Sequence, residues 1–314
     1  MAGLTPLRLG LFSPSLPHLV AIREGYYEER GVTVEQQRIP SSAGLFTALR
    51  DGDLDVALTS PDNIANFRLN KAGDGPVDAR IIAAVDQAGS ISLMGRPGID
   101  APGQIRQGTV AVDARNSGFA FLLYELLNSQ GLVPDVDYRV LEAGGTPSRF
   151  AALLAGSFEA TLLNAGFDVR AQAEGGSLLI PTVDVIPDYL STVLAARSEY
   201  LDRAPDPVTR FVSGFRQAMN YCLDPMRHAD CTDLVVSEWQ VSPDVAARMV
   251  DAVADARTGV VPDAVITPAQ LEVVLELRKR WGGFSEDIDI AAEIRRPRGL
   301  IDERFARMGR PQSG

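Results

Sequence analysis

Two residue types that often carry chemistry are scarce in this chain of 314 residues, which has two cysteines and two histidines. A framework of several disulfides is therefore excluded. Acid–base chemistry near neutral pH would have to use His18 or a carboxylate with a shifted pKa, such as Asp62. A membrane-spanning helix needs roughly 20 consecutive apolar residues, and no run in the sequence approaches that length.

Basic residues are in the minority. Lys and Arg number 30 against 41 Asp and Glu, so the formal net charge is -11 and the pI is near 4.8. Such a chain repels phosphate backbones and anionic lipids, so we expect no nucleic-acid partner and no direct membrane insertion. The content of 46% hydrophobic and 23% charged residues is typical of a globular protein, and the length suggests two domains.

The first residues show no secretory signal peptide and no lipoprotein cysteine, because no basic flank precedes an apolar stretch there. The sequence therefore predicts a cytoplasmic protein if Met1 is the native start. It predicts an extracytoplasmic protein if the chain is a mature form with an added methionine.

The order of predicted elements occurs twice. The first copy has strands at 7–12, 32–35 and 55–59 and helices at 18–30 and 45–50. The second copy has strands at 109–113, 138–141 and 159–163 and helices at 119–130 and 149–155. Alternation of strands and helices indicates parallel α/β sheets. Aligning 45–60 with 149–164 places Phe46 on Phe150 and Gly52 on Gly156, so we expect two similarly built α/β lobes.

The segments outside the repeat connect the lobes or form helices. Residues 79–97, with Gly89 and a Pro-Gly exit, are rich in strand formers and predict a crossover, and 190–196 predict a returning strand. The remainder predicts helices at 206–222, 231–239, 243–257, 268–281 and 301–308.

Six loops follow predicted strands, and ligands of open parallel sheets bind beyond the carboxyl ends of the strands. These loops are rich in Ser, Thr and Asn, and several stand before a helix, where free N–H groups suit a small anion. The same residues would also cap helices, and both interpretations stay open. The polar candidates are Ser13, Ser15, Ser41, Ser42, Thr59, Ser60, Asp62, Asn116, Ser117, Thr146 and Asn164.

Other candidates in these loops are cationic or aromatic. His18 could contact a ligand, act as a base or pack structurally. Arg115 and Arg149 carry forked donors suited to a carboxylate or sulfonate, but could equally form surface ion pairs. Phe12 and Phe119 could stack on a planar ligand or pack in the core.

Cys222 and Cys231 flank a predicted break between helices at Asp224-Pro225, so a disulfide is sterically conceivable. Adding His228 gives three possible metal ligands, whereas structural zinc sites use four. We expect two half-buried thiols and no metal. The sequence contains no dinucleotide-binding Gly-x-Gly-x-x-Gly and no nucleophile elbow, so no cofactor is expected.

Four segments carry a family resemblance: 9–35, 48–57, 117–119 at the head of a helix, and 189–194. They resemble solute-binding proteins of the nitrate, sulfonate and taurine and thiamine-pyrimidine-precursor superfamily. The resemblance spans nearly the whole chain. It implies an α/β type II periplasmic-binding-protein fold with parallel-rich sheets, two crossovers and a helical C-terminal third. The implied lobes are 1–88 with 190–314, and 89–189.

The resemblance also implies a function. The protein would be a monomer that binds a small polar, anionic organic solute (a sulfonate, carboxylate or pyrimidine-like molecule) between its lobes, and Tyr189 joins the candidate ligand-binding residues. Its partner would be the permease of an ABC transporter. Two alternatives stay open: a cytoplasmic lyase or hydrolase of a small carboxylate that uses His18, or a ligand sensor.

Overall fold

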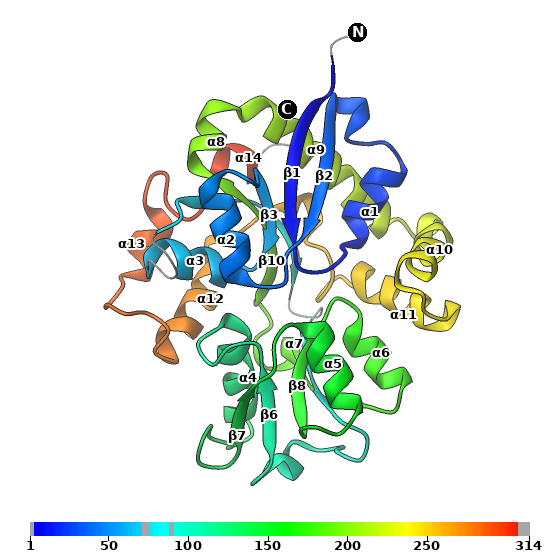
Figure 1. The fold of residues 1–314 in the computed structure, drawn as a ribbon, viewed down its shortest axis with the longest axis vertical. Helices are drawn as coiled ribbons and strands as arrows, with labels where there is room; N and C mark the ends of the chain where they lie inside the picture. Colours follow the sequence, from blue (N-terminus) through cyan, green and yellow to red (C-terminus); the bar gives the residue numbers. More distant parts are fainter. Residues whose placement is uncertain (1–2, 71–75, 88–90, 307–314) are drawn as a thin grey trace.

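The structure, a computed structural model, describes residues 3–70, 76–87 and 91–306. Figure 1 shows two lobes. Each lobe is built on a five-stranded sheet. The first sheet has the order β2-β1-β3-β10-β4. Its strands are β1 (Thr5–Leu11), β2 (Val32–Arg38), β3 (Val56–Thr59), β4 (Ala79–Gln87) and β10 (Leu190–Arg197).

The second sheet repeats this arrangement with the order β7-β6-β8-β5-β9. Its strands are β5 (Ile91–Gly95), β6 (Thr109–Val112), β7 (Arg139–Glu142), β8 (Ala160–Asn164) and β9 (Ser177–Pro181). In both sheets the three strands of the repeated motif are parallel, which confirms the internal repeat. The neighbouring strand, β10 or β5, is antiparallel to both of its partners, so the sheets are mixed and not wholly parallel.

Three helices follow the strands of each repeat. The first lobe has α1 (Leu16–Arg23), α2 (Ser42–Asp51) and α3 (Pro61–Leu69), and the second has α4 (Gly118–Asn128), α5 (Thr146–Leu154) and α6 (Phe167–Ala173). The remaining helices are α7 (Thr182–Val185), α8 (Ser198–Arg203), α9 (Pro205–Leu223), α10 (His228–Trp239), α11 (Pro243–Ala254), α12 (Pro268–Arg280), α13 (Ile290–Arg295) and α14 (Glu303–Ala306). Short 3-10 turns occur at Glu28–Arg30, Pro102–Ile105, Pro225–Arg227 and Pro262–Ala264.

Several predicted boundaries were wrong. The helix expected at 18–30 ends at Arg23, because Gly25 adopts φ +72° and breaks the helix before a separate turn that ends at Gly31. Helices α3, α6, α7, α8 and α13 were not predicted. The predicted crossover glycine, Gly89, and the lobe boundary between 88 and 89 lie outside the described residues, as do the last two residues of the helix expected at 301–308.

Alternating side chains of the strands build the core on both faces of each sheet. In the first lobe, Leu7, Leu9 and Leu11 of β1 face a cluster formed with α1 and α9. Helices α2, α3 and α12 cover the opposite face. In the second lobe, Leu162 faces the cluster around α4, and Leu163 faces the cluster around α5.

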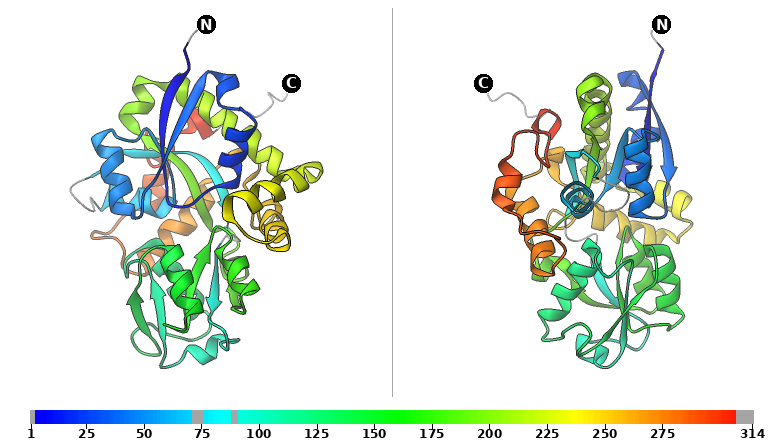
Figure 2. Two further views of the ribbon diagram at one scale, coloured as in Figure 1. Left: turned by 45° about the vertical axis from the view of Figure 1, so that its right-hand side comes forward. Right: turned by 60° about the vertical axis from the view of Figure 1, so that its left-hand side comes forward.

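The C-terminal helices contact both lobes. Figure 2 shows α10 and α11 at one side of the junction between the lobes and α12 at the other. Helix α11 packs on α6, and α12 packs on both α3 and α4. Of the described helices, none has the length and apolar character needed to cross a bilayer.

A buried ion pair holds α12 in this position. The guanidinium of Arg278 makes two hydrogen bonds of 2.7 Å to the carboxylate of Asp62, and the two side chains are 1% and 2% exposed. Arg278 also donates to the backbone carbonyl of Asn116 in the second lobe, at 3.4 Å, and its guanidinium lies over the ring of Phe121. Arg278 therefore links the N-terminus of α3 to the loop before α4.

Replacing Arg278 with Met should lower the free energy of unfolding by about 3–5 kcal/mol, because the carboxylate of Asp62 is then buried without its partner. The matched control is Arg280→Met on the same helix. Arg280 is 63% exposed and pairs with Glu125, so its loss should cost about 1 kcal/mol or less. Chemical denaturation measures both values, and equal losses would contradict the role assigned to the buried pair.

Candidate ligand-binding site

Six helices begin at one cavity between the lobes. Each of α1 to α6 follows a strand of the repeated motif, so its N-terminus lies at the carboxyl edge of the sheet, and these two edges face each other. The N-cap residues all line the cavity, and they are Ser15, Ser41, Ser60, Ser117, Gly145 and Gly166. The partial positive charges of six helix N-termini therefore meet at one place.

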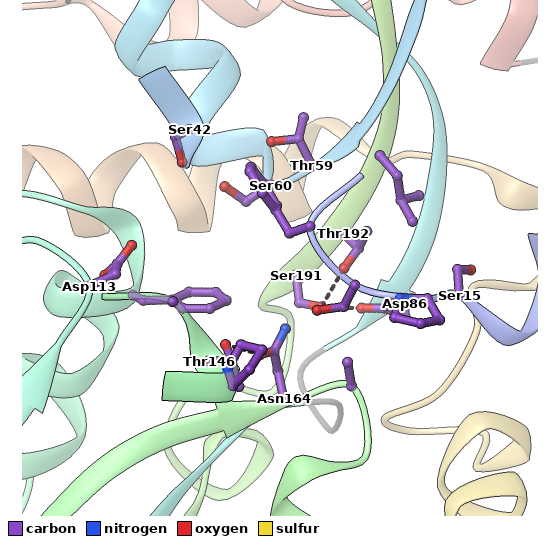
Figure 3. A pocket seen from close by; sticks show the side chains of 18 of the residues that line it. Ser15, Ser42, Thr59, Ser60, Asp86, Asp113, Thr146, Asn164, Ser191 and Thr192 are labelled. Carbon is purple, nitrogen blue, oxygen red and sulfur yellow. Dashed lines mark hydrogen bonds between the residues drawn. The ribbon is translucent and has the colours of Figure 1, made fainter. Parts of the chain in front are cut away.

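The cavity has a volume of about 810 Å³. In Figure 3, Ser42, Thr59 and Ser60 project from the first lobe, and Asp113, Thr146 and Asn164 project from the second. Between them lie Asp86, Ser191 and Thr192, which belong to the two strands next to the crossovers. The site therefore has two opposed polar walls and a polar floor.

Three serine caps already hold backbone N–H groups. The hydroxyls of Ser41, Ser60 and Ser117 accept hydrogen bonds from residues in the first turns of α2, α3 and α4, at 3.0–3.2 Å. Ser15 makes no side-chain cap bond to α1. The capping interpretation is thus confirmed for three of the four serines, and it leaves the remaining N–H groups of these helices facing the cavity.

Arg149 supplies a buried positive charge beneath the second lobe's wall. It is 1% exposed and donates to Thr161 Oγ1 at 3.0 Å, to the carbonyl of Gly144 and to Thr146 Oγ1. The nearby carboxylate of Asp113 favours the charged form of Arg149. Burial lowers the pKa of Arg149, but a guanidinium remains charged at neutral pH.

Three aspartates also line the cavity. Asp86 of β4 accepts a hydrogen bond from Ser191 of β10. This bond joins the strand that precedes the first crossover to the strand that follows the second. Asp113 accepts one from Ser117. Asp168 lies in the first turn of α6, and burial raises its pKa to about 6. Asp168 is thus partly protonated in mildly acidic solution.

Most of the predicted ligand-binding residues lie on the wall of this cavity. They are Phe12, Ser13, Ser15, Ser41, Ser42, Thr59, Ser60, Asn116, Ser117, Thr146 and Asn164. Phe119 and Arg149 line it as well. The structure brings together residues from six loops that span more than 150 positions in the sequence. Contact of each with a ligand stays a prediction.

Two predicted residues are buried away from the cavity. His18 is 0% exposed, its Nδ1 lies 3.0 Å from the Tyr27 hydroxyl, and burial lowers its pKa to about 4. His18 does not line the cavity, so a role as a base there has no support from its position. Tyr189 is 1% exposed, and burial raises the pKa of its phenol. Both residues belong to the packing around the site.

Two further predicted residues are committed to ion pairs elsewhere. Asp62 sits behind the N-terminus of α3, where it pairs with Arg278. Arg115 lies on the surface, pairs with Asp135 and donates to the carbonyl of Val140 at 3.0 Å. In both cases the charged group pairs with an oppositely charged side chain. Spacing in the sequence does not reveal such a pair.

One wall of the cavity and its floor contain no residue that the sequence predicted. Asp86, Ser191 and Thr192 could have been suspected, because they lie in the strands next to the predicted crossovers. The apolar wall had no local signal, since the C-terminal helices reach the cavity only through tertiary packing. This wall comprises Val235, Trp239, Met249, Ala252, Val253 and Val260.

The cysteines and second histidine do not form a metal site. Cys222 and Cys231 are free, buried thiols, and Nε2 of His228 lies 2.9 Å from a carboxylate oxygen of Asp251. Across residues 3–70, 76–87 and 91–306, no group of three or more His, Cys, Asp or Glu side chains is arranged to hold a metal ion.

Comparisons with known proteins agree with this architecture. The model of the NMT1-like family matches residues 2–236. The nitrate-binding protein NrtA of Synechocystis PCC 6803 superposes with a TM-score of 0.80 at 14% identity, over 93% of this chain and 85% of that one. Curated protein sequences gave no match.

Two sulfonate-binding proteins have the same fold. The alkanesulfonate-binding protein SsuA of Xanthomonas axonopodis pv. citri, bound to MOPS, has a TM-score of 0.75 at 16% identity, covering 93% of this chain and 98% of that one. The aliphatic sulphonate-binding protein SsuA of Escherichia coli has a TM-score of 0.71 at 18% identity, covering 95% and 94%. The predicted two-lobed periplasmic-binding-protein fold is therefore confirmed.

The burial of His18 predicts a pH dependence of stability. Its pKa is about 4 in the folded protein and about 6.5 in the unfolded chain, so between these values the unfolded state binds the extra proton. The stabilisation is complete above pH 6.5 and is lost as the pH falls toward 4, by up to about 3 kcal/mol. Denaturation between pH 7 and 4.5 should show a smaller loss for His18→Gln than for the unsubstituted protein.

Asp168 serves as the control because its effect has the opposite sign. Its pKa rises from 3.8 to about 6 on folding, so its contribution to the free energy of unfolding falls as the pH rises through this interval. Asp168→Asn should therefore lose more stability on acidification than the unsubstituted protein. Parallel pH profiles for the two variants would show that neither group titrates as its burial requires.

Proposed function

The chain belongs to the NMT1-like family, and we propose that it binds a small anionic organic solute in the cavity between its lobes. One observation carries this proposal: six helix N-termini and the buried guanidinium of Arg149 converge on a single cavity. Free N–H groups and positive partial charge stabilise anions such as a sulfonate or carboxylate.

The size and lining of the cavity support an organic ligand. Its volume of about 810 Å³ is far larger than an inorganic anion requires. Phe12 and Phe119 stand on the same walls as the serine and threonine hydroxyls, so the site offers apolar surface beside its polar groups. Sulfonates, carboxylates and pyrimidine-like acids share this combination of a polar head and an apolar or planar body.

Closure of the lobes would bury the ligand. The proposed moving units are residues 1–88 with 190–314, and residues 89–189. The strands β4 and β10 lead into and out of the two crossovers, and the hydrogen bond between Asp86 and Ser191 ties them together at the floor of the site. A hinge at this position lets each wall of helix N-termini approach the ligand from its own side.

We infer a role in solute uptake outside the cytoplasm, with an ABC permease as the partner. The nitrate- and sulfonate-binding proteins of the same fold are described as periplasmic, and the match in fold extends over more than nine-tenths of this chain. His18 is 0% exposed and does not line the cavity, which disfavours the alternative of an enzyme that uses His18 as its base.

A thermal-shift screen against sulfonates, carboxylates, pyrimidines and inorganic anions tests the binding function. A ligand at 100 times its Kd contributes about 2.7 kcal/mol, which raises the melting temperature by several degrees. Mass spectrometry of each solution afterwards should recover the compound intact. Conversion of the compound would show instead that the protein is an enzyme.

Ser42→Asp tests the anionic character of the ligand. Ser42 is the first residue of α2 and lines the cavity, so a carboxylate there is compatible with the helix and repels an anion. Affinity for the ligand should fall at least about tenfold, measured by calorimetry. Ser237→Asp, on the exposed surface of α10, adds the same charge away from the cavity and should leave affinity unchanged. Equal affinities in both variants would contradict an anionic ligand.

A further inference from the structure

Two buried thiols meet at the junction between α9 and α10. Cys222 lies in the last turn of α9 and Cys231 in the first turn of α10, and they are 3% and 0% exposed. Both belong to the hydrophobic cluster that covers the first sheet. The two thiols are close enough that each shifts the pKa of the other.

Neighbouring side chains hold the two helices in this register. The Tyr221 hydroxyl donates to a carboxylate oxygen of Asp230 at 2.9 Å, and these residues directly precede the two cysteines. Arg23 of α1 donates to the Tyr221 hydroxyl at 3.1 Å and to the carbonyl of Asp230 at 2.8 Å. The contact between the thiols is thus positioned by a network that joins three helices.

The environment makes the two thiols unequal. The interaction with Cys222 and the guanidinium of Arg23 lower the pKa of Cys231, whereas the interaction with Cys231 and burial raise the pKa of Cys222. Cys231 is therefore the better nucleophile of the pair.

We propose that Cys222 and Cys231 are a site of covalent modification, where a disulfide joins the end of α9 to the start of α10. The oxidant is a disulfide of the small-molecule or thiol–disulfide-exchange class. The Cys231 thiolate attacks one sulfur of that disulfide and releases one thiolate. Cys222 then loses its proton, attacks the Cys231 sulfur and releases the second thiolate, so two protein thiols are oxidised and one external disulfide is reduced.

Because both thiols are buried, exchange requires local opening of this junction or takes place during folding. The new bond would close a short loop, from 222 to 231, and so reduce the conformational freedom of the unfolded chain. It would also fix the start of α10, whose residues Val235 and Trp239 form part of the apolar cavity wall. The modification thereby stiffens one side of the ligand site.

Refolding the full chain in a buffer of reduced and oxidised glutathione tests this site. The expected product has lost two hydrogen atoms by intact mass, has no thiol that reacts with Ellman's reagent in denaturant, and melts several degrees higher than the same protein after reduction. The site is refuted if both thiols still titrate, if only glutathione adducts or cross-linked dimers form, or if the oxidised monomer melts lower than the reduced one.

Cys222→Ser and Cys231→Ser are the matched controls. Each retains one thiol, so oxidation cannot close the loop, and the melting temperature should be the same with and without reductant. An equal rise of melting temperature in either single variant would assign the stabilisation to the buffer and overturn the proposal.

Discussion

Parallel pairing of β1 with β2 and β3, repeated by β6 with β7 and β8, is the constraint from which the site follows. A crossover between parallel strands must return the chain to the same edge of the sheet, so every helix in the repeat begins at the carboxyl edge. Two such sheets placed edge to edge bring six helix N-termini to one cavity. No single residue creates this convergence of helix N-termini.

Groups of both signs surround the cavity. Convergent helix dipoles and a buried guanidinium repel one another unless negative charge is present. Asp86, Asp113 and Asp168 line the same cavity, and the first two accept hydrogen bonds from Ser191 and Ser117. Because the carboxylates stand at fixed positions, the cavity presents a defined pattern of positive and negative groups and not a diffuse potential.

The C-terminal third does more than complete the first lobe. Helix α12 carries Arg278 to the N-terminus of α3 and to the loop before α4, and α11 places Met249 against Gly166 at the start of α6. Each contact touches a helix N-terminus that lines the cavity. These helices therefore connect the two lobes at both sides of the cleft, and one apolar cluster continues through α12 from one lobe into the other.

The order of elements, the repeat, the six loops and their helix-capping residues were readable in the sequence, because they depend on local periodicity and on glycine and serine at helix ends. The direction of β5 and β10 was not, since antiparallel pairing there joins strands far apart in the chain. Tertiary structure also determined where His18, Asp62 and Arg115 lie and which residues form the apolar wall. Burial and the nearest opposite charge determine whether such a side chain faces a ligand, and both are properties of the packed chain.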